Sequence, residues 1–184
     1  MTPSHLFLTE DAVFGTGRAP AYDTNAKINP PLRTEADRQA LLRGVNQGIV
    51  DAIATDHAPH AIEDKLCEFD DAAFGISCLE TALGTLMTSV QRGELTLSAV
   101  LRALTIGPAR AFRIDSRIPG AGTLTVGVST DITVFSPTER WIVEPRRFAS
   151  KGKNTPLGGQ ELCGRVRAVI IRGELALLEE ATHA

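Results

Sequence analysis

The chain has little of several features that mark special classes of protein. Its 184 residues contain three cysteines, one tryptophan and one tyrosine, and its formal net charge is −3. Cys67, Cys78 and Cys163 are an odd number without a CxxC spacing, so a disulfide framework is not expected. We therefore expect a protein with reduced thiols in the cytoplasm.

Long apolar runs and basic clusters are also missing. No stretch approaches the roughly 18 uninterrupted apolar residues that a membrane span needs. The first eight residues, Met-Thr-Pro-Ser-His-Leu-Phe-Leu, have no basic region followed by an apolar core, so they do not read as a signal peptide. A mildly acidic chain without a basic run has no electrostatic footprint for nucleic acid. We expect neither a membrane nor a nucleic acid as partner.

The composition that remains is that of an ordinary globular protein. Hydrophobic residues make up 43% and charged residues 22% of the chain. These fractions exclude a disordered tail, a collagen and a coiled coil. A chain of this length can bury roughly 70% of its unfolded surface, which is enough for one or two small domains.

The first part of the chain reads as alternating helix and strand. Residues 33–48 predict a helix with Thr34 as its N-cap and Gly48 as its end. The short apolar run 49–55 that follows predicts a parallel strand covered on both faces. Three further helices are expected, over residues 76–92, over 97–104 with Thr96 as N-cap, and from Pro108 through Phe112.

From about residue 113 the pattern changes to short strands separated by glycines. Residues 123–126 and 131–135 look like the strands of a hairpin. Further strands are expected at 141–143 and 165–171, with a loop over 149–160 between them. The chain is thus predicted to be an α/β portion followed by a small β portion.

The strongest chemical signal is the segment from Asp56 to His60, which also contains His57 and Pro59. An apolar strand delivers Asp56 to its C-terminal tip, where a (β/α) barrel keeps its active site. A carboxylate there can ligate a metal or take a proton from metal-bound water. The alternative is that Asp56 caps the next segment and the two histidines lie on the surface.

Two weaker signals accompany it. The double proline after Asn29 fixes the backbone and can hold Asn29 and Arg33 in set directions, although a plain strand-to-helix elbow explains it better when taken alone. His5 stands beside an apolar Leu-Phe-Leu run, where a lone histidine is more often a buried structural residue than a ligand.

Taken together, the motifs resemble one family. Four strings carry the likeness: Pro-Ser-His-Leu-Phe-Leu-Thr-Glu from residue 3, Lys-Ile-Asn-Pro-Pro-Leu-Arg from residue 27, Ala-Thr-Asp-His-Ala-Pro-His from residue 54 and Asn-Thr-Pro-Leu-Gly-Gly from residue 154. They occur in order over essentially the whole chain, and they are similar to the bacterial long-chain dihydroorotases of the amidohydrolase superfamily. Sister enzymes such as dihydropyrimidinase and allantoinase keep only the Asp-His at the last strand.

The resemblance implies an α/β fold in two parts. Residues 1–112 would be the C-terminal part of a (β/α)8 TIM-type barrel, from the end of strand 6 to strand 8. Residues 113–184 would be the C-terminal strands of a small β-sandwich domain.

The resemblance also implies roles for individual residues. His5 and Asp56 match metal ligands, and Asp56 also matches the catalytic general acid and base. Substrate contacts are implied for four residues: Asn29, His60, Phe74 and Gly75. His57 would be structural, and Cys78 stands where the family commonly has glycine. The implied cofactor is zinc, as a binuclear centre in the complete enzyme.

The implied reaction is the reversible cyclisation of N-carbamoyl-L-aspartate to dihydroorotate in pyrimidine synthesis. The expected partners are this small-molecule substrate and, beside it, a second copy of the chain or aspartate carbamoyltransferase. Two alternatives stay open: another cyclic amidase, such as dihydropyrimidinase or allantoinase, and a non-catalytic subunit that scaffolds aspartate carbamoyltransferase.

One family feature is missing. The family's barrel begins with a His-x-His pair, whereas the four histidines here, His5, His57, His60 and His183, form no such pair. We therefore expect the chain to be the C-terminal portion of a longer enzyme and to be inactive alone. We also expect residues 1–112 not to fold stably alone, because a barrel needs eight strands to close.

Overall fold

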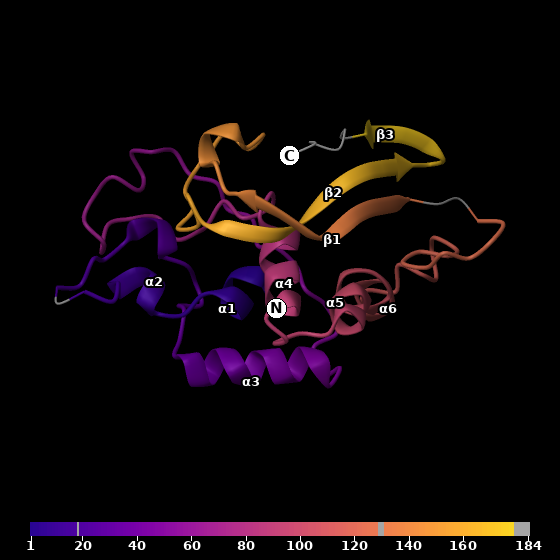
Figure 1. The fold of residues 1–184 in the computed structure, drawn as a ribbon, viewed down its shortest axis with the longest axis horizontal. Coiled ribbons are helices and arrows are strands. Elements are labelled where there is room, and N and C mark those ends of the chain that lie inside the picture. Colours follow the sequence, from indigo (N-terminus) through magenta and orange to yellow (C-terminus); the bar gives the residue numbers. More distant parts are fainter. Residues whose placement is uncertain (18, 129–130, 179–184) are drawn as a thin grey trace.

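The computed structural model describes residues 1–17, 19–128 and 131–178. Figure 1 shows a three-stranded sheet on one side of the molecule and helix α3 on the opposite side, with α4 between them. The helices are α1 (Pro3–Phe7), α2 (Asp11–Phe14), α3 (Glu35–Asn46), α4 (Ala82–Gln91), α5 (Leu97–Leu104) and α6 (Ile106–Ala111), with short 3₁₀ turns η1 (Thr24–Ala26) and η2 (Pro145–Arg147). The strands are β1 (Ile132–Ile142), β2 (Glu161–Ile171) and β3 (Glu174–Leu178). No helix in the described part of the chain is long and apolar enough to cross a membrane.

The helix predicted over residues 33–48 is confirmed as α3. The Thr34 hydroxyl accepts the backbone N–H of Asp37, and the Asp37 carboxylate accepts the backbone N–H of Thr34, which makes a capping box. Gly48 follows the helix with a φ of 78°, a conformation that glycine adopts without steric cost. Leu42 and Val45 form the buried face. The local sequence is enough to predict this helix because its N-cap and its apolar face both lie within the same short segment.

The other helices agree with prediction to different degrees. Helix α5 begins after Thr96 as expected. The helix predicted over residues 76–92 begins only at Ala82, because Ile76 pairs with His57 and the Ser77 N–H donates to the Asn154 carbonyl at 2.8 Å. Tertiary hydrogen bonds therefore keep the first residues of that range out of the helix. The last helix, α6, begins at Ile106, two residues before the predicted start.

The parallel strand predicted at residues 49–55 is wrong in this structure. The segment is extended, but it is not part of a sheet. Met1 lies beside it, donating its N–H to the Ala52 carbonyl at 3.1 Å and accepting the Ala54 N–H at 2.9 Å, which is the pattern of a parallel pair. The Ile53 N–H turns instead to the Ala103 carbonyl at 2.9 Å. Within the described residues only Met1 bonds to the segment in the pattern of a parallel strand, and a parallel strand needs a continuous neighbour to bond with.

The C-terminal sheet is antiparallel, in the order β1-β2-β3. The strands predicted at 131–135 and 141–143 are the two ends of the single strand β1, and the strand predicted at 165–171 lies within β2. The register of β1 on β2 is interrupted around Pro137, because proline has no N–H to donate to the neighbouring strand. The strand nevertheless continues past this irregularity, where two separate strands were predicted.

Two further differences concern turns. Residues 123–126 are not a strand: the Thr123 N–H and hydroxyl both bond to the Gly120 carbonyl, at 3.0 and 2.8 Å, and close a turn. Strand β3 was not predicted. It follows Arg172 and Gly173, whose φ angles of 53° and 82° are those of a tight hairpin turn.

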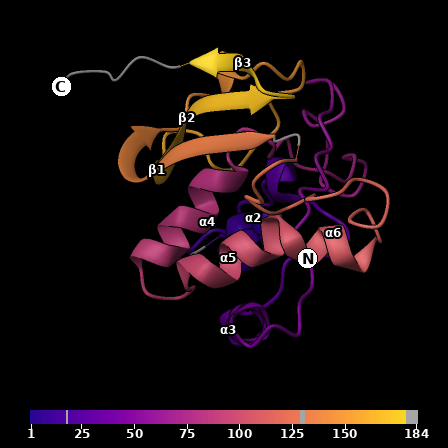
Figure 2. The ribbon, with the colours of Figure 1, turned by 90° about the vertical axis from the view of Figure 1, so that its right-hand side faces the viewer.

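The sheet and the helices share an interface. Figures 1 and 2 both show the sheet lying over α4, which packs chiefly against β2. Gly164 makes the approach possible, because a Cβ there would lie 2.5 Å from Cγ of Met87. The Thr88 hydroxyl accepts the Cys163 N–H at 2.8 Å across the same interface. The division into domains 1–112 and 113–184 stays a prediction, and these contacts cross it.

Candidate active site

Asp56 lies at the end of the extended segment 49–55. Its φ of 51° is in the left-handed region, which aspartate tolerates better than most residues. The side chain is exposed and has no hydrogen bond or ion pair among the described residues. The structure therefore presents a carboxylate that is free to accept a proton or a cation.

His57, the next residue, points back into the protein. Its Nδ1 accepts the backbone N–H groups of Cys78 and Leu79, both at 3.1 Å. Because amide N–H groups only donate, Nδ1 carries no proton in this arrangement, and a neutral ring has its proton on Nε2. His57 thus fixes the start of the 78–81 segment relative to Asp56.

His5 lies on the short helix α1. Its Nδ1 is 2.6 Å from the Thr2 hydroxyl and its Nε2 is 2.8 Å from the Pro30 carbonyl. A carbonyl only accepts, so Nε2 donates, and in a neutral ring Nδ1 accepts from Thr2. This contact brings α1 to the turn that follows Asn29. The Asn29 side chain is exposed, without a hydrogen bond to the described residues.

Three of the predicted substrate-contacting residues come together. His60 Nε2 donates to the Phe74 carbonyl at 2.9 Å. Gly75 has a φ of 141°, and a Cβ there would lie 2.9 Å from His60 Nε2 and 2.5 Å from the Ala58 Cβ. The close approach of the two segments therefore needs glycine at this position. Because Nε2 donates to Phe74, Nδ1 can donate to an anion only when both ring nitrogens carry protons, and the Asp64 carboxylate lies 3.8 Å from it.

Asn154 joins these segments, and no site role was predicted for it. The buried side chain accepts the His60 N–H on Oδ1 at 2.8 Å, and its Nδ2 donates to the carbonyls of Gly75 at 3.0 Å and Ala58 at 3.1 Å. The side-chain amide of Asn154 thus bonds to both the 58–60 segment and Gly75. Its position in the 149–160 loop, inside one of the strings that carry the resemblance, was the only indication in the sequence.

Cys78 contacts residues next to both predicted metal ligands, and it lies just before α4 and not in it. The pKa of the Cys78 thiol is raised to about 11, chiefly by burial and also by the charge of Asp56, although a hydrogen bond with Ser4 opposes the rise. The thiol donates to the Thr55 carbonyl at 3.1 Å. Ser4 precedes His5, so residues beside both predicted ligands contact one neutral thiol.

The donor types suit zinc, because imidazole nitrogen and carboxylate oxygen are among its ordinary ligands. The described residues, however, include no group of three or more histidine, cysteine, aspartate or glutamate side chains that could hold an ion. Binding at His5 Nε2 would also replace its hydrogen bond to Pro30. His183 lies outside the described residues. His5 and Asp56 fit a part of a zinc site, which needs further ligands from elsewhere.

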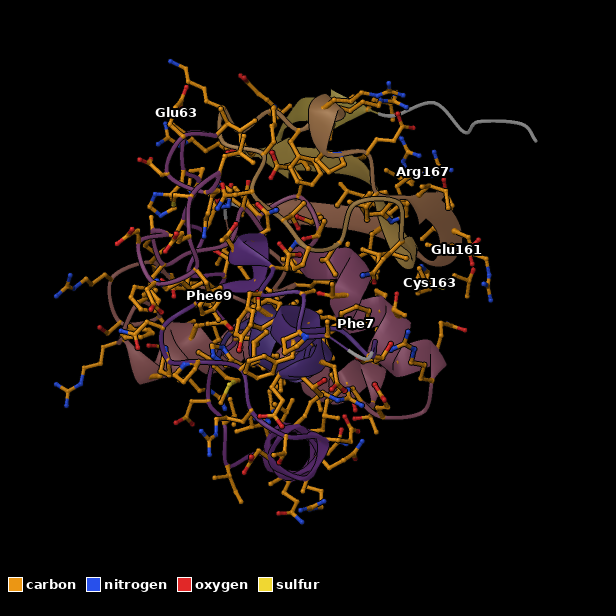
Figure 3. All side chains as sticks on the ribbon, turned by 90° about the vertical axis from the view of Figure 1, so that its left-hand side faces the viewer. Phe7, Glu63, Phe69, Glu161, Cys163 and Arg167 are labelled. Atoms are coloured by element: carbon orange, nitrogen blue, oxygen red, sulfur yellow. The ribbon has the colours of Figure 1, made fainter. Side chains whose placement is uncertain are left out.

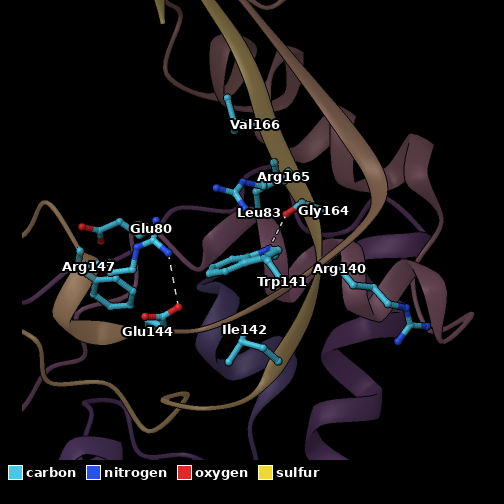
Figure 4. A pocket seen from close by; sticks show the side chains of 12 residues that line it. Glu80, Leu83, Arg140, Trp141, Ile142, Glu144, Arg147, Gly164, Arg165 and Val166 are labelled. Carbon is cyan, nitrogen blue, oxygen red and sulfur yellow. Dashed lines mark hydrogen bonds and ion pairs between the residues drawn. The ribbon is translucent and has the colours of Figure 1, made fainter. Parts of the chain in front are cut away.

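Two pockets lie in the region. A pocket of about 660 Å³ borders the candidate site and is lined by His60 and Asn154 among others. Another, of about 560 Å³, lies between α4 and the β1–β2 hairpin and contains none of the predicted site residues. Figure 4 shows Trp141 in this second pocket and the ion pair of Arg147 with Glu144, whose atoms are 3.5 Å apart. The predicted chemistry therefore belongs to the first region.

Known proteins resemble this chain over most of its length. The model of the amidohydrolase family matches residues 22–176. The chain belongs to the amidohydrolase family. The dihydroorotase of Syntrophus aciditrophicus (strain SB) is 43% identical over 179 residues, which are 97% of this chain and 39% of that protein. The dihydroorotase of Anaeromyxobacter sp. (strain K) is 45% identical over 175 residues, 95% of this chain and 38% of that protein.

Solved structures confirm the fold class. An L-hydantoinase (dihydropyrimidinase) from Arthrobacter aurescens covers all of this chain with a TM-score of 0.85 at 26% identity, and this chain spans 40% of it. A D-hydantoinase (dihydropyrimidinase) from Thermus sp. covers 96% of the chain with a TM-score of 0.83 at 26% identity. The amidohydrolase chain described here is therefore part of a larger barrel fold, and it spans about two fifths of the length of the relatives it matches.

Proposed function

We propose that this amidohydrolase chain supplies metal-binding and substrate-binding residues to a dihydroorotase. The observation that carries the proposal is the junction of His60 with Phe74 and Gly75, held by Asn154, a short distance along the chain from an unbonded Asp56. An imidazole and a fixed backbone segment suit a substrate that bears a carboxylate, as dihydroorotate does. The identities of 43–45% with dihydroorotases support the same substrate class.

In the proposed reaction His60, with protons on both ring nitrogens, binds the substrate carboxylate through Nδ1 in place of the Asp64 carboxylate, and the backbone around Phe74 and Gly75 sets the position of the ring. Asn29 contacts the substrate from the turn after η1. Asp56 takes the proton from the attacking water, the oxygen adds to the amide carbon, the ring C–N bond breaks, and the proton passes to the ring nitrogen. In the direction of synthesis the same proton returns through Asp56.

Zinc held in part by His5 and Asp56 would polarise the carbonyl and lower the pKa of the attacking water. A catalytic zinc needs about three protein ligands and an open position. Since His5 and Asp56 are two, we propose that the remaining ligands lie outside these 184 residues and that the chain alone is inactive. The complete enzyme would act in pyrimidine synthesis in the cytoplasm, as a homodimer or with aspartate carbamoyltransferase.

The test uses the complete polypeptide encoded by the gene. It should hydrolyse dihydroorotate and cyclise N-carbamoyl-L-aspartate with a larger kcat/KM than it shows for hydantoin or dihydrouracil. His60→Ala should raise KM for dihydroorotate roughly 10-fold or more, because a hydrogen bond to a charged group is lost. A larger kcat/KM for the uncharged rings, with KM for dihydroorotate indifferent to His60, would overturn the proposal.

The fold likeness to hydantoinases favours a second candidate, a cyclic amidase for an uncharged ring. The substrate comparison separates it from the first. The non-catalytic alternative is separated by the zinc content of the complete polypeptide, which should be about two ions per chain for a binuclear centre and none for a scaffold. Retention of His5 and Asp56 argues against the scaffold, because such proteins lose metal ligands by substitution.

A further inference from the structure

Two lysines are buried next to the candidate site, and neither has a role so far. Lys27 precedes the turn that contains Asn29, and its residue is 8% exposed. Lys65 lies in the middle of the 61–74 loop, the segment that connects His60 to Gly75, and it is 4% exposed. Lysine is almost never buried to this degree unless its ammonium group has partners.

Lys27 holds the second half of the 61–74 loop. Its Nζ donates to the carbonyls of Phe69 at 2.7 Å and Asp70 at 2.9 Å. The same ammonium lies over the rings of Phe69 and Phe74, 5.3 and 4.5 Å from their centroids. The Lys27 carbonyl accepts the Gly75 N–H at 2.9 Å, so the backbone of Lys27 bonds to the end of the loop while its side chain bonds to residues 69 and 70.

Lys65 lies in the loop and bonds back to the segment that contains Lys27. From inside the loop, its Nζ donates to the Thr24 carbonyl at 3.0 Å and to the Ala73 carbonyl at 2.6 Å. The Thr24 hydroxyl in turn donates to the Lys65 carbonyl at 2.6 Å. The 24–27 segment and the loop therefore hold each other through two ammonium groups and one hydroxyl.

Both ammonium groups use main-chain carbonyls, and no ion pair with either lysine occurs among the described residues. Burial lowers the pKa of Lys65 and the charge of Lys27 also lowers this pKa, while the carboxylates of Asp23 and Asp64 act in the opposite sense. Two cations kept together without a carboxylate partner are an unfavourable arrangement. Packing alone gives no reason for it.

The loop is held by both apolar and polar contacts. It contains no helix or strand, and its apolar residues Ile62 and Leu66 are 65% and 77% exposed, whereas Phe69 packs against the apolar cluster that includes Ile28. Figure 3 shows Glu63 at the outer edge of the molecule and Phe69 nearer its centre. The lysine contacts add the ammonium hydrogen bonds that join the loop to the 24–27 segment.

We propose that Lys27 and Lys65 are positioning residues that hold the 61–74 loop, and with it His60, Phe74 and Gly75, in register with Asn29 for substrate binding. The inference rests on the proposed function for its substrate. Both lysines act through the loop and make no contact with the reacting atoms. Their effect falls on substrate binding, because the residues that they align are those proposed to hold the substrate carboxylate and ring.

The experiment compares Lys27→Met and Lys65→Met with Arg43→Met in the complete polypeptide. Methionine keeps an unbranched apolar side chain and removes the donors. Arg43 is an exposed cation of α3 whose side chain has no hydrogen bond or ion pair to the described residues and does not line the pocket beside His60, so its variant controls for the loss of one charge. We expect KM for dihydroorotate to rise about tenfold or more in the two loop variants, with kcat changed much less. Arg43→Met should leave both constants unchanged.

Amide hydrogen exchange supplies a second readout. The amides of residues 61–75, including Gly75, should exchange faster in Lys27→Met and Lys65→Met, while amides of α3 and α5 keep their protection. Lys27→Arg, which keeps the charge and can donate to two carbonyls, should recover most of the lost affinity. If Lys65→Met does not fold, Thr24→Val removes the reciprocal hydroxyl bond at little change in volume and should show the same effect, smaller in size.

Two results overturn the inference: folded variants with KM within about twofold of the parent, or an unchanged exchange rate in the 61–75 segment. A wild-type polypeptide that turns over hydantoin or dihydrouracil and not dihydroorotate contradicts the proposed function instead. In that case the exchange rates decide the positioning role by themselves. The two failures are thus separable.

Discussion

The helical region and the candidate site are held together by different forces. Around α3, α4 and α5 the contacts are apolar, with side chains such as Leu42, Leu86 and Val100 almost fully buried. Between residues 56 and 78 there is no helix or strand, and beside apolar contacts such as those of Ile76 the chain is held by single polar side chains, chiefly Asn154, Lys27 and Lys65. Removing a methyl group should weaken the first region locally, whereas removing one amide or ammonium should release a whole segment of the second.

The largest effect is expected when the helical region is separated from the sheet. Residues 1–112 alone should show no cooperative thermal transition by circular dichroism. Helix α4 would lose its contact with β2, and Asn154 would be gone from the site. Apolar surfaces left uncovered also favour association. A monomeric species with a single sharp transition would show that the helical region is self-sufficient.

The next largest effect is on activity. Asp56→Asn in the complete polypeptide should lower kcat by about 10²–10⁴-fold, because a general acid and base is lost. Its stability should hardly change, since Asp56 has no partner among the described residues and asparagine tolerates a left-handed backbone equally well. Asp51→Asn, an exposed carboxylate on the same extended segment, is the matched control. Equal activities of the two variants would remove Asp56 from the reaction.

A pair of variants tests the contrast between the regions directly. Leu42→Ala should lower the free energy of unfolding by about 2–5 kcal/mol through the cavity it leaves, with KM unchanged. Asn154→Ala should lower it by about 1–3 kcal/mol, because the groups it leaves unpaired are partly able to find water. It should also raise KM, since His60 and Gly75 lose their shared partner. Urea unfolding and steady-state kinetics measure both, and a KM effect of Leu42→Ala as large as that of Asn154→Ala would contradict the distinction.

The smallest effect concerns pH. Arg38 is buried between Glu35 and Glu94, and hydrogen bonds from its guanidinium lower the pKa of Glu35 to about 2 and also lower the pKa of Glu94. A carboxyl whose pKa is lower in the folded state stabilises the fold above its unfolded pKa of about 4.5, and this stabilisation is lost as the pH falls through the folded value.

Glu35→Gln should therefore be less stable than the parent above pH 4.5 and nearly equal to it at pH 2. The difference should stay below about 1 kcal/mol, because Glu35 itself is largely exposed. Urea unfolding at several pH values checks this, with Glu63→Gln, an exposed carboxylate of the 61–74 loop, as the control. A difference that grows toward acid pH would have the wrong sign.

Sequence reasoning worked where local chemistry and burial agree. Thr34 and Thr96 cap the helices that were predicted after them, and Gly48 ends the first. It failed at residues 49–55, whose apolar character indicates burial but cannot supply neighbouring strands. It failed also between residues 135 and 141, where two separate strands were expected and the single strand β1 continues through Pro137.

For the candidate site, the motif strings led to the residues but not to their arrangement. The string around Asp56 and His60 indicated a polar site, and the resemblance assigned roles that stay predictions. That His60 meets Phe74, and that Asn154 fastens both segments, could not be derived, because the partners lie 14 and 94 positions away along the chain. No pattern of spacing connects them.

By itself the sequence determined the local elements, the types of ligand and the likeness to one family, because caps, apolar periodicity and motif residues act over a few positions. The tertiary structure decided which of these elements meet. It engaged both ring nitrogens of His5, left Asp56 unbonded and buried Lys27 and Lys65 between the 24–27 segment and the 61–74 loop. The physical reason is that a buried polar group must find a partner wherever the fold provides one, and the chain fixes that partner only when it closes on itself.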